Sequence, residues 1–212
     1  LPGGKHVIVD PGLVVNEVQQ HCLDRLVAEM EKDTLRIEDI GLVINTHAHP
    51  DHYGASQVIK EKSAALVTIS REDAQVIKVM MKQMAPQLEM LGIEIPEIET
   101  DFYLQEGQLR LNEELSLEIL STPGHLPGHM SVYLPAIKAH IGGDLIFSGS
   151  TGRVDMPGGS PRLLKESIER IARLEIEYLL TGHQYGSPGI IQGSQDIKRN
   201  FDFVRKNVFP YL

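Results

Sequence analysis

The residues most suited to catalysis or metal binding are histidines and aspartates that follow short apolar runs. His47, His49, Asp51 and His52 lie close together, directly after an apolar, β-branched run over 40–45. Residues two apart in an extended segment face the same side, so His47 and His49 can coordinate one ion together. A turn then brings Asp51 and His52 to a different side. These are more ligands than one tetrahedral ion needs, and the surplus indicates a second ion.

Further candidate ligands occur later in the chain, again at the ends of apolar runs. His125, Asp144 and His183 stand where a scaffold would present loops, and His129 is a near neighbour of the first. The single cysteine, Cys22, excludes an internal disulfide framework and a cysteine-based zinc cluster. A bound metal must therefore be held by His, Asp or Glu. The other isolated histidines are expected to be ordinary surface or core residues: His6, His21 and His140.

The length and the amino-acid composition limit the classes of protein to which the chain can belong. The chain has 212 residues, 42% of them hydrophobic, which suits one globular domain with a real core. No apolar window is long enough for a transmembrane helix. With 29 acidic against 20 basic side chains, long-range electrostatics disfavour nucleic acid and anionic membranes as partners, so we expect a small-molecule substrate. The lack of disulfides favours a cytoplasmic location.

The elements that must position these residues follow an α/β order. The patterns predict strands over 5–9, 40–45, 65–69, 131–134, 140–147 and 178–180, and half-buried antiparallel strands within 107–120. They predict helices over 14–32, 53–62, 71–92, 163–174 and 196–208, with a break at Pro86. Strands that alternate with helices indicate α/β layering with partly parallel strands. No linker or repeat divides the chain, so we expect a single domain over 1–212.

The segment 71–92 is rich in methionine, with Met80, Met81, Met84 and Met90. Packing within the protein is the first interpretation. Because methionine suits adaptable apolar surfaces, a mobile lid over the substrate pocket and a homodimer contact are the alternatives.

The ordered motifs resemble the metallo-β-lactamase superfamily. Its His-x-His-x-Asp-His signature is matched by 46–52, and its later signatures by 122–129, 142–147 and 181–183, after an Asp-Pro-Gly turn at 10–12. The segments 152–159 and 182–185 resemble the glyoxalase II-like branch. The resemblance implies a four-layer αβ/βα sandwich with metals in the cleft between its sheets. It also implies that the family's first edge strands are missing before residue 1.

The resemblance further implies two metal sites. The first would be His47, His49 and His125, and the second Asp51, His52 and His183, with Asp144 bridging both. His129 would be a supporting residue. We expect two divalent ions, zinc first, with iron or manganese as alternatives, because the same side chains suit all three metals.

The chemistry follows from charge. A water held between two ions ionises near neutral pH, and its hydroxide can attack an ester-like bond while the ions polarise the carbonyl oxygen. Asp51 could hold the proton and pass it to the leaving group, as the catalytic acid–base. Tyr185 could reach the substrate, or pack with its hydroxyl on backbone. Arg153 and Asp155 are expected to form an ion pair that steadies their loop.

These features favour a binuclear metal-dependent hydrolase of a thioester, as in glyoxalase II, or of a lactone. Glyoxalase II enzymes carry a helical C-terminal domain with basic residues that bind glutathione. The last predicted helix of this chain has four basic residues, but a charged helical face that is simply exposed to solvent would carry them too: Lys198, Arg199, Arg205 and Lys206. The alternative is a persulfide dioxygenase, which binds a single iron through residues matching His47, His125 and Asp144. A nuclease and a non-catalytic metal-binding protein are disfavoured, the first by the acidic balance and the second because structural sites close their coordination.

Overall fold

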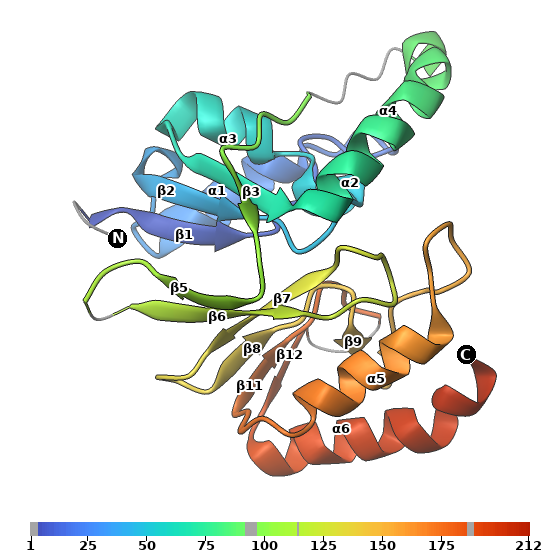
Figure 1. Ribbon diagram of the computed structural model, residues 1–212. Coiled ribbons are helices and arrows are strands. Elements are labelled where there is room, and N and C mark those ends of the chain that lie inside the picture. Colours follow the sequence, from blue (N-terminus) through green and yellow to red (C-terminus); the bar gives the residue numbers. More distant parts are fainter. Residues whose placement is uncertain (1–3, 92–96, 114, 186–188) are drawn as a thin grey trace. The chain divides into compact units, whose positions relative to one another are not determined.

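The computed structural model describes residues 4–91, 97–113, 115–185 and 189–212. The chain forms two compact units, which we call unit 1 (residues 1–104) and unit 2 (residues 105–212) (Figure 1). Each unit has its own sheet with helices packed on it. This confirms the predicted α/β class. That the two units form one domain stays a prediction.

Unit 1 is built on a four-stranded parallel sheet in the order β1-β2-β3-β4. Its elements are β1 (His6–Val9), α1 (Cys22–Lys32), a 3-10 turn (Ile37–Asp39), β2 (Ile40–Ile44), α2 (Pro50–Tyr53), α3 (Ser56–Ser63), β3 (Leu66–Ser70), α4 (Arg71–Leu91) and β4 (Phe102–Leu104). Leu23 of α1 and Ile59 of α3 share a buried cluster with Val43 and Val67 of the sheet. Since the strands are parallel, the loops after β1, β2 and β3 leave the same edge of the sheet, where chemistry-bearing loops gather.

Three helix predictions in unit 1 need correction. The helix expected over 14–32 begins only at Cys22, because the Asn16 side chain accepts the backbone N–H groups of Val18 and Gln20 and holds a turn there. The helix expected over 53–62 is two helices, α2 and α3. The break expected at Pro86 is wrong, because α4 continues through it to Leu91. Residue 92 lies outside the described residues.

The methionines of α4 differ in their surroundings. Met80 and Met81 are half-buried and Met90 is exposed. Met81 lines a cavity of about 420 Å³ together with Ile98 and Tyr103. Among the described residues, part of this segment therefore packs within its own unit. The lid over the substrate pocket and the homodimer contact stay predictions.

Unit 2 carries a six-stranded mixed sheet in the order β12-β11-β8-β7-β6-β5, with a small β9–β10 hairpin beside it. Its elements are β5 (Gly107–Arg110), β6 (Ser116–Ser121), β7 (Met130–Leu134), β8 (Ala139–Ile141), β9 (Ile146–Phe147), β10 (Ser150–Thr151), α5 (Pro161–Ile171), β11 (Tyr178–Leu180), β12 (Ile190–Gln192), α6 (Ser194–Asn207) and a last 3-10 turn (Phe209–Tyr211). The pairs β5–β6 and β6–β7 are antiparallel, as predicted, and β8 pairs in parallel with β11.

The strand predicted over 140–147 is instead two short strands, β8 and β9. Between them the chain turns at Gly143, whose φ is +51°, and the backbone N–H of Leu145 donates to the carbonyl of Gly142. This turn carries Asp144 out of the sheet. Three further short strands were not predicted from the sequence: β4, β10 and β12.

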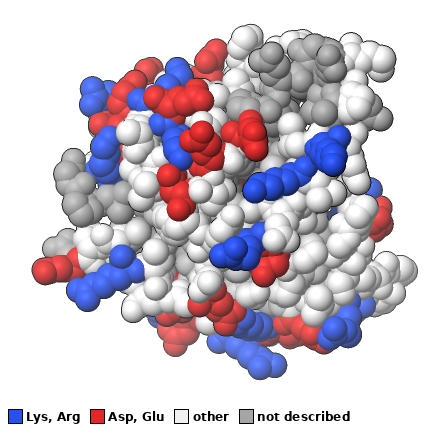
Figure 2. Space-filling view, turned by 45° about the horizontal axis from the view of Figure 1, so that its top comes forward, with Lys and Arg blue, Asp and Glu red and all other residues white. Residues whose placement is uncertain are grey.

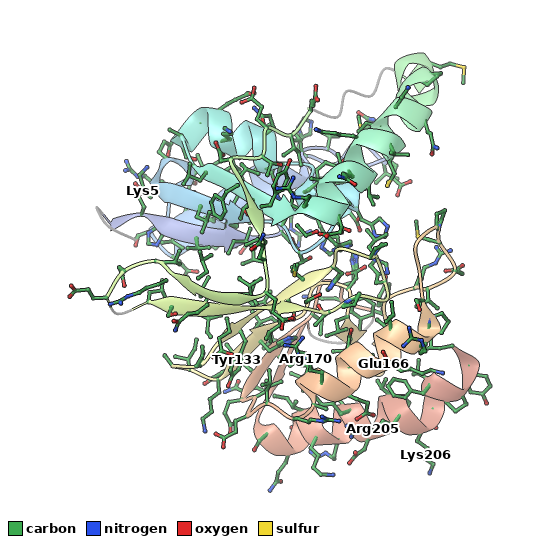
Figure 3. The ribbon with its side chains drawn as sticks, in the orientation of Figure 1. Lys5, Tyr133, Glu166, Arg170, Arg205 and Lys206 are labelled. Carbon is green, nitrogen blue, oxygen red and sulfur yellow. The ribbon has the colours of Figure 1, made fainter. Side chains whose placement is uncertain are left out.

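Helices α5 and α6 pack on one face of the unit 2 sheet (Figure 1). Leu164 and Ile168 of α5 share a buried cluster with Phe201 of α6 and Leu179 of β11. Ion pairs fix the edges of this layer. Arg170 donates to Glu106 at 2.8 and 2.9 Å, and Arg205 donates to Glu169 at 2.7 and 2.9 Å. Figure 3 labels the two arginines.

Surface charge is mixed rather than single-signed. On the face shown in Figure 2, acidic and basic side chains are interspersed. On α6, Lys198 pairs with Asp202 at 2.6 Å, Arg199 pairs with Asp196, and Arg205 pairs with Asp202 at 2.9 Å. These cations are therefore matched by acids of the same unit, as expected for a solvated helical face. Among the described residues, every helix is too short or too polar to cross a lipid bilayer.

Candidate functional site

In unit 1 the predicted histidines lie together in one short segment that follows β2, with His47 and His49 before α2 and His52 within it. His47 is fully buried, and His49 and His52 are 8% and 2% exposed. The His47 Nε2 and His49 Nδ1 atoms are 3.1 Å apart, and the rings of His47 and His52 have centroids 4.0 Å apart. Such clustering of imidazole nitrogens at the end of a parallel strand fits shared coordination of metal.

Asp51 stands beside this cluster on the first turn of α2. Its side chain is 48% exposed, and its Oδ2 lies 4.0 Å from His52 Nε2. A half-exposed carboxylate next to candidate ligands can bind a cation and can also exchange protons with solvent. The position suits both of the roles predicted for Asp51.

Asp10, which the sequence marked only as part of a turn, makes contacts that give it a place in the candidate site. Asp10 accepts the Thr46 backbone N–H at 2.7 Å, the Thr46 hydroxyl at 2.6 Å and a bond from His52 Nδ1 at 2.8 Å. Asp10, His47 and His52 also place ligand-type atoms within 4.8 Å of one another. Because the Asp10 oxygens are already used in these bonds, we assign it the support of the histidines. An acid directly after β1, at the edge where β2 ends, was the available signal.

In unit 2, Asp144 lies between the two other predicted histidines. Its Oδ2 is 3.4 Å from His125 Nε2, and its Oδ1 is 3.5 Å from His183 Nε2. His125 and Asp144 are buried, and the His183 side chain is 29% exposed. The three come from loops after β6, β8 and β11. Each oxygen of one carboxylate thus faces a different imidazole, which is the arrangement of a bridging ligand.

His129 supports this group rather than joining it. Its Nε2 accepts the backbone N–H of Asp144 at 3.2 Å, so its Nδ1 carries the proton and donates to the Thr122 hydroxyl at 2.9 Å. Both ring nitrogens are engaged. This geometry is consistent with a supporting role for His129, which stays a prediction.

Close packing behind Asp144 explains a glycine of the 152–159 segment. A Cβ atom on Gly152 would lie 1.9 Å from the Asp144 carbonyl oxygen and 3.1 Å from the His125 ring. Only glycine lets β10 approach the ligand loop this closely. Arg153 and Asp155 form the predicted ion pair, at 2.9 and 2.8 Å, and the Arg153 hydrogen bond lowers the pKa of the Asp155 carboxyl.

Tyr185 lies near the site residues of unit 2 but is 65% exposed. Its ring centroid is 5.1 Å from that of Phe147 and 5.6 Å from that of His183. One face therefore packs on aromatic neighbours while much of the side chain stays open to solvent. A contact with substrate stays a prediction.

The donor set fits divalent metal ions. In His52 and His125, Nδ1 is committed to an oxygen, of Asp10 at 2.8 Å and of the Arg153 carbonyl at 2.7 Å. When Nδ1 donates, the lone pair is on Nε2, which is the form of histidine that binds metal. Both units therefore present histidines of this form, and both add carboxylates.

Comparison with known proteins decides the family. The family model described as the metallo-β-lactamase superfamily matches residues 2–183. The chain belongs to this superfamily. Its α/β fold is accordingly the αβ/βα sandwich that the motifs predicted, and the recognition of the family from those motifs is confirmed.

Relatives within the metallo-β-lactamase superfamily are named as metallohydrolases. A probable metallo-hydrolase of Methanocaldococcus jannaschii is 31% identical over 85% of this chain and 84% of the relative. Hydroxyacylglutathione hydrolase GloC of Haemophilus influenzae is 31% identical over 66% of this chain and 68% of that protein.

Solved structures agree on the fold. The protein TTHA1623 in a di-iron-bound form matches 97% of this chain and 88% of its own, with a TM-score of 0.66 and 28% identity. The BLEG-1 B3 metallo-β-lactamase matches 94% of this chain and 89% of its own, with a TM-score of 0.71 and 24% identity. The second likeness concerns the fold alone.

Proposed function

We propose that this protein is a binuclear metal-dependent hydrolase of an ester-like bond. The ligands would be those predicted: His47, His49 and His125 for one ion, Asp51, His52 and His183 for the other, and Asp144 for both. The observation that carries the proposal is Asp144, whose two oxygens face His125 and His183 at 3.4 and 3.5 Å. A purely structural site seldom divides one carboxylate in this way.

When bound, a pair of divalent ions lowers the pKa of water and polarises a carbonyl oxygen. The residues of the chain supply the rest. Asp10 and the Arg153 carbonyl hold the rings of His52 and His125 in their metal-binding form. The half-exposed Asp51 would accept a proton from the attacking water and deliver it to the leaving group. No serine or cysteine nucleophile is needed.

The preferred substrate is a small thioester of the hydroxyacylglutathione kind, with lactones second. The likeness to hydroxyacylglutathione hydrolases supports this choice, as do the 152–159 and 182–185 segments. Tyr185 would contact the substrate through its exposed side. Tyr185→Phe should then raise KM about fivefold with kcat unchanged, since a single neutral hydrogen bond contributes roughly 1 kcal/mol. An unchanged KM would assign Tyr185 to packing.

The test is a substrate screen with zinc-, iron- and manganese-loaded protein. Thioester, lactone, β-lactam and phosphoester substrates would be compared with a His47→Ala variant carrying the same metal supplement. Thioester or lactone turnover well above the variant supports the proposal. Turnover equal to the variant on every substrate contradicts it.

A single-iron persulfide dioxygenase is the second candidate, with His47, His125 and Asp144 as the iron ligands. The His125–Asp144 pair of unit 2 and the di-iron form of TTHA1623 make iron a metal to test. Elemental analysis counts the ions per chain, and two ions of any kind favour the hydrolase. One iron, together with oxygen consumption on glutathione persulfide, would replace the hydrolase by the dioxygenase.

A further inference from the structure

A buried carboxylate outside the proposed ligand set lies at the start of α4. Asp73 is 0% exposed, and its Oδ2 accepts the backbone N–H of Ala48 at 3.0 Å. Ala48 is the residue between His47 and His49, and it is also fully buried. Asp73 therefore holds the main chain at the point where both histidines of this pair are attached.

The backbone of Asp73 is also held in place. Its own backbone N–H donates to the Ser70 hydroxyl at 3.1 Å, so the last residue of β3 caps the first turn of α4. The N-terminal turn of a helix favours a negative charge. Burying a carboxylate costs free energy unless hydrogen bonds or nearby charges offset that cost. A buried aspartate at this position therefore indicates a specific role.

The segment between β2 and α2 is held by a second acid as well. Asp10 accepts the N–H of Thr46, two residues before Ala48. Two carboxylates, one from the loop after β1 and one from α4, thus fix the backbone on either side of His47. Hydrogen bonds to charged acceptors are roughly twice as strong as neutral ones, which suits a segment that must not shift when it binds an ion.

We propose that Asp73 is a positioning residue that sets the spacing of His47 and His49 for metal binding. This rests on the proposed function, because it presumes that these histidines bind metal. Asp73 does not touch the reacting atoms. Its removal should weaken the binding of one ion about 10- to 100-fold, the usual effect of losing a residue that orients a metal ligand.

The experiment is a Co²⁺ titration of the full chain in the presence of a chromophoric chelator, with the visible spectrum of bound Co²⁺ recorded at each step. Wild type, Asp73→Ala and Asp73→Asn would be compared. Asp73→Ala should weaken one of the two binding steps about 10- to 100-fold and alter the spectrum of that ion. Asp73→Asn keeps an acceptor for Ala48 but loses the charge, and should weaken the same step about three- to tenfold.

Asp101→Ala is the matched control. Asp101 also belongs to unit 1 and accepts a backbone N–H, that of Val67 at 2.7 Å, but it holds the other end of β3. It should lower stability in urea without changing either Co²⁺ step. This separates a general loss of stability from a specific loss of positioning.

The outcomes are distinguishable. If Asp73→Ala, or Asp73→Asn should the alanine variant not fold, binds both ions as tightly as wild type, the proposal is overturned. It is equally overturned if Asp101→Ala weakens the same step to the same extent. If wild type itself binds no Co²⁺, the proposed function has failed instead.

Discussion

The two units hold their candidate ligands in contrasting ways. In unit 1, His47, His49 and His52 follow one another in a single segment, and the groups that hold them include charged carboxylates, Asp10 among them. In unit 2 the candidate ligands come from three separate loops. The hydrogen-bond partners described for the His125 ring and the Asp144 backbone are neutral: the Arg153 carbonyl for the first, and His129, which itself bonds the Thr122 hydroxyl, for the second.

This contrast follows from chain connectivity. A contiguous segment brings its ligands together whatever the rest of the fold does, but its backbone must be pinned to point them correctly. Separate loops are placed by the sheet that carries them, so neutral hydrogen bonds suffice for fine adjustment. Unit 2 then depends on one shared carboxylate, Asp144, to relate its two histidines.

The largest effect should come from removing that shared carboxylate. Asp144→Ala takes away the oxygens that face both His125 and His183, so we expect a loss of kcat/KM well beyond the roughly 100-fold of a supporting residue. Metal content per chain should fall with it. Asp202→Asn, at an exposed acid of α6 in the same unit, is the control. Full metal content and activity in Asp144→Ala would refute the bridging role.

Removing the charge of Asp10, which supports the histidines of unit 1, should have the next largest effect. Asp10→Asn leaves one oxygen for three donors, two from Thr46 and one from His52, and we expect metal affinity to fall about 10- to 100-fold. Competition with a chelator measures this. Asp39→Asn serves as control, because Asp39 pairs with Arg36 on the surface of the same unit. Equal affinity in the two variants would speak against Asp10 as a support.

The neutral support of unit 2 should matter less. His129→Leu removes the acceptor for the Asp144 backbone N–H, and we expect metal affinity to fall about 10-fold. His129→Gln, which retains an acceptor, should stay closer to wild type. If His129→Leu costs more affinity than Asp10→Asn, the contrast between charged and neutral supports is wrong.

The same contrast explains what could be predicted from sequence. The His47–His52 motif is contiguous, so its ligands can be identified from their spacing alone. The candidate ligands of unit 2 could be proposed because each follows an apolar run and matches an ordered family motif. Family resemblance therefore supplied what spacing could not. The strands β5, β6, β7 and β11 were predictable for a similar reason, since their patterns are local.

Supporting residues were harder to predict, because their role depends on contacts distant in sequence. Asp10 meets Thr46 across 36 positions, and Asp73 meets Ala48 across 25. An isolated acid after a strand has no periodicity to mark it. The start of α1 was mispredicted for a related reason, as the side-chain bonds of Asn16 overrode an apolar spacing that resembled a helix.

The last prediction concerns stability rather than metal binding, at a histidine of unit 2 that lies outside the ligand set. His140 of β8 is fully buried, its Nε2 is 2.9 Å from the Ser131 hydroxyl oxygen, and burial lowers its pKa from 6.5 to about 3. Between these two values the unfolded chain takes up a proton that the folded protein does not. The free energy of unfolding should therefore fall as the pH falls below 6.5, by at most about 1.4 kcal/mol for each pH unit.

His140→Gln does not titrate, so in metal-free protein this share of the pH dependence should disappear. Urea unfolding at a series of pH values between 7 and about 4 measures the slope. His21→Gln, which changes an exposed histidine of unit 1, is measured in parallel as the control variant. An unchanged slope in His140→Gln would mean that the histidine is protonated in the folded state. The sheet of unit 2 would then tolerate a buried charge. The use of neutral hydrogen-bond partners in unit 2 would be limited to the residues around Asp144.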